Sequence, residues 1–134
     1  MPITGSCLCK GIQYAITTPL TQVGNCHCSM FRKASGAAFL TIANIKAKDL
    51  RWTGGENLIA RYESSPGGER LFCGKCGSTL GGRPVDPKAT ELWIVLGTLD
   101  DDPGVKPSSH HYVGSKAPWY ELADQLPQFK EFLS

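Results

Sequence analysis

Short stretches of alternating hydrophobic and polar residues recur along the chain and predict strands. Residues 11–17 place Ile12, Tyr14 and Ile16 on one face, which is the period of a half-buried strand. The stretch 91–96 is almost continuously apolar and predicts a strand that is buried on both faces. Further short strands are expected at residues 23–28, 38–42, 50–53, 58–63, 69–73, 78–81 and 110–113.

Helical signals are few and short. Ser29 is a suitable N-cap for a brief helix that ends near Ser35, because Gly36 follows as a stop signal. Two further helical turns are expected at residues 119–122 and 128–133, and the acidic, Pro-containing stretch 100–107 predicts an exposed loop. The pattern therefore predicts a mainly β fold with short helical turns.

Composition and charge narrow the class of protein. The 134 residues include 15 Gly and 9 Pro, which favours many turns, and no repeat or linker divides the chain. A single domain over residues 1–134 is expected. The net charge is +2, with 14 Lys and Arg against 12 Asp and Glu, and no basic run suggests nucleic-acid or membrane binding. No secretory signal pattern or apolar stretch of about 18 residues is found, so a cytoplasmic location is expected.

The six cysteines form three close pairs, and this spacing points to metal binding. Cysteines in a reducing compartment rarely form disulfides, and near neighbours in sequence chelate a metal more readily than they bridge each other. A secreted disulfide framework is the alternative that an even count permits. The pairs are Cys7 and Cys9, Cys26 and Cys28, and Cys73 and Cys76.

The first predicted site combines two of these pairs. The spacing Cys73-Gly-Lys-Cys76 is that of a zinc knuckle, and Cys7 and Cys9 would supply two more thiolates. Lys10 and Lys75 flank the ligands and would offset the negative charge of a four-thiolate zinc site. Such a site has no open ligand position, so it is predicted to be structural; buried cysteines without a metal are the alternative.

Several segments together resemble one protein family. They are Gly5-Ser6-Cys7-Leu8-Cys9, Asn25-Cys26-His27-Cys28-Ser29, Arg32-Lys33-Ala34-Ser35-Gly36 and Phe72-Cys73-Gly74-Lys75-Cys76-Gly77, with His110-His111-Tyr112, Trp119-Tyr120 and residues 124–127 near the end. With these flanks, the three ordered cysteine pairs resemble the glutathione-dependent formaldehyde-activating (GFA) family, which also includes the centromere protein V (CENP-V) domain. The resemblance implies twisted antiparallel β-sheets bound to zinc, with a structural ion on Cys7, Cys9, Cys73 and Cys76.

The resemblance also implies a second, open zinc site in a Cys-His-Cys-x-x-Cys motif. Here the sequence departs from the pattern, because Phe31 stands at the third cysteine position. Only Cys26 and Cys28 remain, and two thiolates hold zinc more weakly than three ligands. His27 could replace the missing ligand, although in a strand it points away from both cysteines. Met30 is a poor zinc ligand, His110 or His111 could reach in from elsewhere, and two free thiols are the remaining alternative.

Family membership would imply a carbon–sulfur lyase that acts on adducts of glutathione, or a similar small thiol, with formaldehyde or a related small aldehyde. In this reading Cys26, Cys28 and His27 are the catalytic candidates. Substrate binding is assigned to Arg32 and Lys33, as cations for carboxylates, and to His110. The alternative is an altered or non-catalytic member with one zinc, acting as a binding or redox-sensitive module. A homodimer is compatible with either reading.

Overall fold

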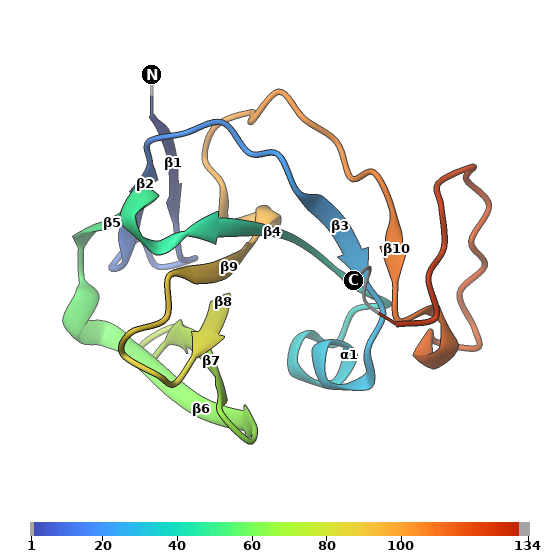
Figure 1. The fold of residues 1–134 in the computed structure, drawn as a ribbon. Coiled ribbons are helices and arrows are strands. Elements are labelled where there is room, and N and C mark those ends of the chain that lie inside the picture. The colour runs from blue at the N-terminus through green and yellow to red at the C-terminus, as the bar shows by residue number, and fades with distance from the viewer. Residues whose placement is uncertain (1, 132–134) are drawn as a thin grey trace.

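The computed structural model describes residues 2–131, and this part of the chain is built mainly from strands (Figure 1). Its one α-helix, α1, spans Ser29–Ser35. The strands are β1 (Ile3–Ser6), β2 (Gln13–Ile16), β3 (Val23–Cys26), β4 (Leu40–Lys46), β5 (Leu50–Gly54), β6 (Ile59–Ser65), β7 (Gly68–Cys73), β8 (Thr79–Pro84), β9 (Glu91–Val95) and β10 (His110–His111). Four 3-10 turns lie at Ala47–Asp49, Glu56–Leu58, Leu96–Thr98 and Val113–Ser115.

The strands form two sheets. The smaller has the order β1-β2-β5, and the larger has the order β10-β3-β4-β9-β8-β7-β6. All pairs are antiparallel except β10 with β3. The small sheet lies at one end of the molecule and β10 at the other, with α1 below β3 and β4 (Figure 1). The expected mainly β fold with antiparallel sheets is confirmed.

The main core lies where the two sheets meet. Tyr14 and Ile16 of β2 pack with Ala43 and Ile45 of β4 and with Ile94 of β9. The predicted alternation in β2 is confirmed, because Ile12, Tyr14 and Ile16 are all buried. Burial of this apolar face from water is the main driving force that holds the sheets together.

Strand β9 is covered on both faces, as its apolar sequence predicts. Leu92 and Ile94 face the main core. Trp93 and Val95 belong instead to a second cluster with Cys26 and Phe31, on the side of the large sheet where α1 packs. This second face carries the thiol cleft described below.

The β3–α1 connection differs from the prediction in two details. Strand β3 ends at Cys26 rather than at residue 28. The helix spans Ser29–Ser35 and ends before Gly36, as predicted, but its N-cap is Cys28 rather than Ser29; Gly36 adopts the left-handed conformation. The reason is that the Cys28 sulfur accepts a hydrogen bond from the backbone N–H of Phe31 at 3.4 Å, and this occupies the role of a capping oxygen.

The two helical turns predicted near the end of the chain are wrong over the described residues. A single turn closes at residues 117–120, and residues 121–131 contain no helix. Their backbone groups pair with β10 instead: His110 N–H donates to Pro127 at 2.8 Å, and Phe129 N–H donates to His110 at 2.9 Å. Residues 132 and 133 of the predicted second turn lie outside the described part. The strand expected at 110–113 is only two residues long.

The loop after β9 lies over the first strand. Asp101 accepts hydrogen bonds from the backbone N–H and the hydroxyl of Thr4, both at 2.8 Å, and Asp100 accepts one from the Ser6 hydroxyl at 2.9 Å. The loop is exposed at these acidic residues, as predicted, and it also fixes the position of β1. No helix between residues 2 and 131 is long and apolar enough to cross a membrane.

Candidate metal centre and thiol cleft

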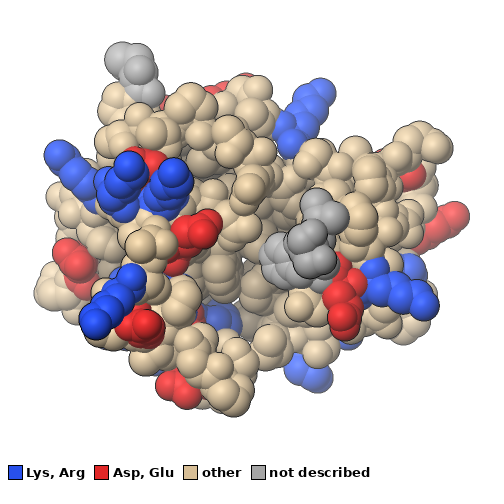
Figure 2. Space-filling model, in the orientation of Figure 1, with Lys and Arg blue, Asp and Glu red and all other residues tan. Residues whose placement is uncertain are grey.

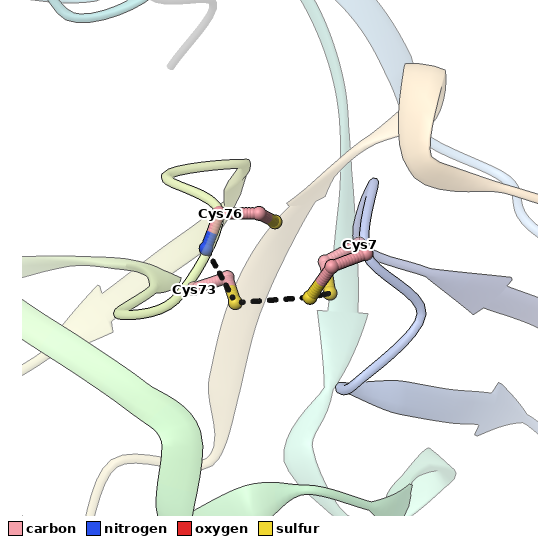
Figure 3. Close-up of side chains that lie close together, drawn as sticks. Cys7, Cys73 and Cys76 are labelled. Carbon is pink, nitrogen blue, oxygen red and sulfur yellow. Dashed lines mark hydrogen bonds between the residues drawn. The ribbon is translucent and has the colours of Figure 1, made fainter.

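Two tight turns from different sheets carry the four cysteines of the first predicted site. Cys7 and Cys9 lie in the turn between β1 and β2, whereas Cys73 ends β7 and Cys76 lies in the turn that follows it. Figure 3 shows Cys7, Cys73 and Cys76 pointing toward one another from these two loops. The structure therefore joins segments that are 64 residues apart between Cys9 and Cys73.

The sulfur positions fit a tetrahedral metal ion. The Sγ atoms of Cys7 and Cys9 are 3.5 Å apart and those of Cys9 and Cys73 are 3.9 Å apart; all four lie within 4.8 Å of one another. Zinc–sulfur bonds of about 2.3 Å in a tetrahedron require sulfurs about 3.8 Å apart. Within residues 2–131 no other group of three or more Cys, His, Asp or Glu side chains has this arrangement. This four-cysteine centre can hold a metal such as zinc.

Backbone N–H groups and one hydroxyl form hydrogen bonds with sulfur atoms of this centre. Ile12 N–H donates to Cys7 Sγ at 3.3 Å, and Cys76 N–H donates to Cys73 Sγ at 3.3 Å (Figure 3). Hydrogen bonds from the hydroxyl and the backbone of Ser78 lower the pKa of the Cys76 thiol to about 5. Deprotonated sulfur is the form that binds a metal ion.

Ser78 is a member of this site that the sequence did not reveal. Its Oγ lies 3.1 Å from Cys76 Sγ and accepts a hydrogen bond from the backbone N–H of Leu8 at 2.9 Å. One side chain thus connects the two loops that carry the cysteines. A serine two residues after a knuckle gives no sequence signal for this role, because its partner Leu8 comes from a distant turn.

The third cysteine pair lines a separate cleft of about 450 Å³ between α1 and the turn joining β6 and β7. Figure 2 shows that this face of the molecule is hollowed near its centre and that charges of both signs are mixed around it. The lining residues are Cys26, Cys28, Met30, Phe31, residues 64–69, Arg83, Pro84, Trp93 and Tyr112. The cleft is large enough for a small-molecule ligand.

The two thiols in this cleft are unequal. Cys26 is buried, and Cys28 is half-buried at the start of α1. A hydrogen bond from Cys26 lowers the pKa of the Cys28 thiol to about 6, and backbone N–H groups of Phe31 and Met30 lower it further against the effect of burial. The same thiol pair, together with burial, raises the pKa of Cys26. Of the two thiols, Cys28 is therefore the one that loses its proton more readily.

Phe31 occupies the place of a third ligand. Phe31 lies in the first turn of α1, three positions after the N-cap Cys28, and its ring packs against Trp93 with centroids 4.8 Å apart. A phenyl ring has no lone pair to offer a metal. Within the described residues Cys26 and Cys28 belong to no group of three ligating side chains. The residues present do not fit the second zinc site that the resemblance implies.

His27 lies in the segment between β3 and α1 and does not line the cleft. Its Nε2 is 2.9 Å from Nδ1 of His110, whose Nε2 is in turn 2.9 Å from the Asp124 carboxylate. Both histidines are buried and pack against Phe39. Burial, and then the nearby His110, lowers the pKa of His27 to about 4, so His27 is neutral at pH 7. The hydrogen bond from His110 lowers the pKa of Asp124.

The remaining candidate residues from the sequence do not line the cleft. Arg32 donates from Nε to the carbonyl of Ser115 at 3.1 Å, and Lys33 is exposed on α1. His111 lines a different hollow of about 230 Å³ and lies 2.8 Å from the Ser109 hydroxyl. The roles of Arg32, Lys33 and His110 in substrate binding stay predictions.

Arg83 and Glu69 supply the charged side chains of the cleft wall, and sequence reasoning missed both. They form an ion pair at 3.1 Å, with 31% of the Arg83 side chain exposed. They come from β8 and β7, which pair Glu69 with Arg83. In the sequence, Arg83 and Glu69 are marked only by their position in the hairpin that carries the cysteine knuckle. That position does not indicate which face of the hairpin turns toward α1.

Fold and site together define a small, mainly β protein with a four-cysteine metal centre and a separate thiol-lined cleft. The family model for glutathione-dependent formaldehyde-activating enzyme matches residues 2–115. The chain belongs to this family, and the resemblance inferred from the cysteine pairs is confirmed.

Two individual proteins are similar to parts of the chain. An uncharacterized lyase of Schizosaccharomyces pombe is 32% identical over 76 residues, which are 57% of this chain and 53% of the relative. The chain thus matches about half the length of that relative. A crystal structure of a Rhodobacter sphaeroides protein has 23% sequence identity and a TM-score of 0.59, covering 78% of this chain and 91% of that one. At this identity the second likeness supports the fold alone.

Proposed function

We propose that the protein is a cytoplasmic lyase that makes or breaks the carbon–sulfur bond between a small thiol such as glutathione and formaldehyde or a related small electrophile. The observation that carries this proposal is the cleft of about 450 Å³ with Cys26 and Cys28 in its wall. Family membership and the lyase name of the fission-yeast relative support the reaction class. A nucleophilic sulfur in a space of substrate size is what carbon–sulfur chemistry requires.

The other residues divide into binding and supporting roles. Arg83 lines the cleft and, beside its bond to Glu69, keeps further N–H groups that can bind a carboxylate of glutathione. Arg32 and Lys33 add positive charge beside the cysteine pair. His27 and His110 would have a supporting role outside the cleft. The hydrogen bond between their rings would fix the segment that carries Cys26 and Cys28.

Zinc would occupy the four-cysteine centre and support folding. Four thiolates complete the coordination of the ion, so no position is left for a substrate. The proposed chemistry therefore belongs to the cleft, while the metal ties together the two loops that carry its ligands. Removal of zinc would affect the reaction only through the stability of the fold.

One observation favours a second candidate function. Phe31 removes the third ligand that the family motif would supply, so this chain could be an altered member that binds a thiol or responds to oxidants through Cys26 and Cys28. In that case the two cysteines would form a reversible disulfide with a small disulfide as the oxidant. No turnover of the thiol–aldehyde adduct would then accompany the redox change.

The test is release of formaldehyde from S-(hydroxymethyl)glutathione by the purified full chain, compared with Cys28→Ser and with the exposed control Ser29→Ala. Serine retains a capping oxygen at position 28, so the helix start should be preserved. We expect activity in the wild type and in Ser29→Ala, and its loss in Cys28→Ser. Equal formaldehyde release with and without protein would contradict the lyase proposal, and a reversible Cys26–Cys28 disulfide would then favour the second function.

A further inference from the structure

An aromatic ring occupies the position in the cleft where the family motif has its third cysteine. Phe31 belongs to an apolar cluster with Cys26, Leu40 and Val95, and its ring lies on Trp93. The sulfur atoms therefore face hydrophobic side chains where a metal ligand would be needed. Apolar side chains exclude water, and hydrogen bonds and electrostatic interactions beside them are therefore stronger than in water.

Hydrogen bonding separates the roles of the two sulfurs. The Cys28 sulfur accepts the backbone N–H of Phe31 at 3.4 Å and the S–H of Cys26. Cys26 is 1% exposed, whereas Cys28 is only half-buried. The more acidic and more accessible sulfur thus has the buried Cys26 thiol as its direct neighbour, and both line the same cleft. The lowered pKa of Cys28 and the raised pKa of Cys26 agree with this assignment.

We propose that Cys28 is itself the nucleophile of this chain, that Cys26 supplies and recovers the proton, and that the centre needs no metal ion. This inference rests on the proposed function and specifies its reacting atoms. It also assigns a role to Phe31, which keeps the third ligand position apolar so that the Cys28 thiolate stays free to react.

The step balances without an external oxidant or reductant. The Cys28 thiolate forms a carbon–sulfur bond with the carbonyl carbon of the aldehyde, and the carbonyl π electrons move to oxygen, which takes the proton of Cys26. The product is a hydroxymethyl thioether on Cys28, with Cys26 as thiolate. In reverse, Cys26 takes the hydroxyl proton, the carbonyl re-forms and Cys28 leaves as thiolate, after which the aldehyde adds to a small thiol bound in the same cleft.

The first experiment measures zinc per chain and thiol reactivity in the protein purified with its metal retained. Iodoacetamide is added in limiting amount, and the alkylated cysteines are identified by peptide mass mapping. We expect one zinc per chain and alkylation of Cys28 before every other cysteine, because the four-cysteine centre protects its own thiolates. Phe31→Cys should raise the zinc content toward two and slow the alkylation of Cys28 by about tenfold or more.

Two controls separate a new ligand from other effects of substitution. Phe31→Leu changes the ring without adding a ligand, and Ala37→Cys adds an exposed thiol beyond α1. Both should keep one zinc and rapid alkylation of Cys28. Two zinc ions per chain in the wild type, with Cys28 protected until a chelator removes one of them, would overturn the metal-free centre.

Activity measurements distinguish this inference from the proposed function. Cys28→Ser should lower kcat/KM by about a hundredfold or more, and Cys26→Ser should shift the pH profile toward higher pH because the proton donor is changed. If the wild type releases no formaldehyde but Cys28 is still alkylated first at one zinc per chain, the lyase proposal fails and the assignment of the nucleophile stands. If Cys28→Ser remains fully active, the lyase proposal stands and the nucleophile assignment fails.

Discussion

Ser78 illustrates how one hydroxyl can support a metal centre without binding the metal. It lies next to Cys76 Sγ and accepts the backbone N–H of Leu8 from the opposite loop. Ser78→Ala leaves both groups without this partner, so we expect a loss of about 1–2 kcal/mol in the free energy of unfolding and faster zinc transfer to a chromogenic chelator. Urea unfolding and the transfer rate measure the two effects. Ser29→Ala is the exposed control, and equal transfer rates in both variants would contradict the proposed link between the loops.

Tyr14 provides a residue-scale test at alkaline pH. Its hydroxyl is 2.6 Å from the Thr98 hydroxyl, and burial raises its pKa to about 12 from an ordinary value of 10.0. Because the folded state holds this proton more tightly, stability should fall as the pH rises above the unfolded value. We expect Tyr14→Phe to be less stable at pH 8 and to show a weaker decline in unfolding free energy between pH 10 and 12. Parallel declines in both proteins would show that Tyr14 does not contribute.

At the scale of elements, the sequence predicted those helices and strands that local sequence patterns determine. The end of α1 before Gly36 followed from local helix signals, and the strands followed from alternation. The cap was wrong because a cysteine sulfur took the role expected of Ser29. The C-terminal turns failed for a different reason: the backbone at Pro127 and Phe129 finds its partners on β10, which local sequence does not show.

The contact between β8 and β9 gives an element-scale prediction. A Cβ atom at Gly81 would collide with the carbonyl oxygen of Trp93, whereas one at Gly97 would meet open space. Gly81→Ala should therefore force the two strands apart and cost about 1–3 kcal/mol of unfolding free energy. Gly97→Ala is the matched control and should change stability by no more than about 0.5 kcal/mol. Chemical denaturation of both variants measures the difference, and equal stabilities would mean that the strands adjust without strain.

At the scale of the whole molecule, the two cysteine sites differ in how far sequence could define them. The four-cysteine centre was predictable because close pairs with glycine-rich turns constrain both geometry and chemistry. The cleft was predictable only in part. Cys26 and Cys28 followed from the motif, but Arg83 and Glu69 lie in strands β8 and β7, and their place opposite α1 depends on sheet order and twist.

The four-cysteine centre also predicts how metal removal should affect the whole fold. It links the β1–β2 turn of the small sheet to the β7–β8 turn of the large sheet, and it closes a loop between Cys9 and Cys73, which are 64 residues apart in sequence. Cross-links that close loops of this length contribute about 4 kcal/mol by reducing the freedom of the unfolded chain. A strong chelator should therefore lower the unfolding free energy of the wild type by several kcal/mol.

Variants at the two sites should differ in how strongly the chelator affects them. Cys73→Ser should already have lost the metal and much of this stability, so the chelator should have little further effect on its urea midpoint. Cys28→Ser leaves the metal centre intact and should respond as strongly as the wild type. An equal response in all three proteins would mean that the chelator acts elsewhere. The opposite pattern, with a response that disappears only in Cys28→Ser, would place the metal in the cleft and reverse the division between a structural centre and a reactive thiol pair.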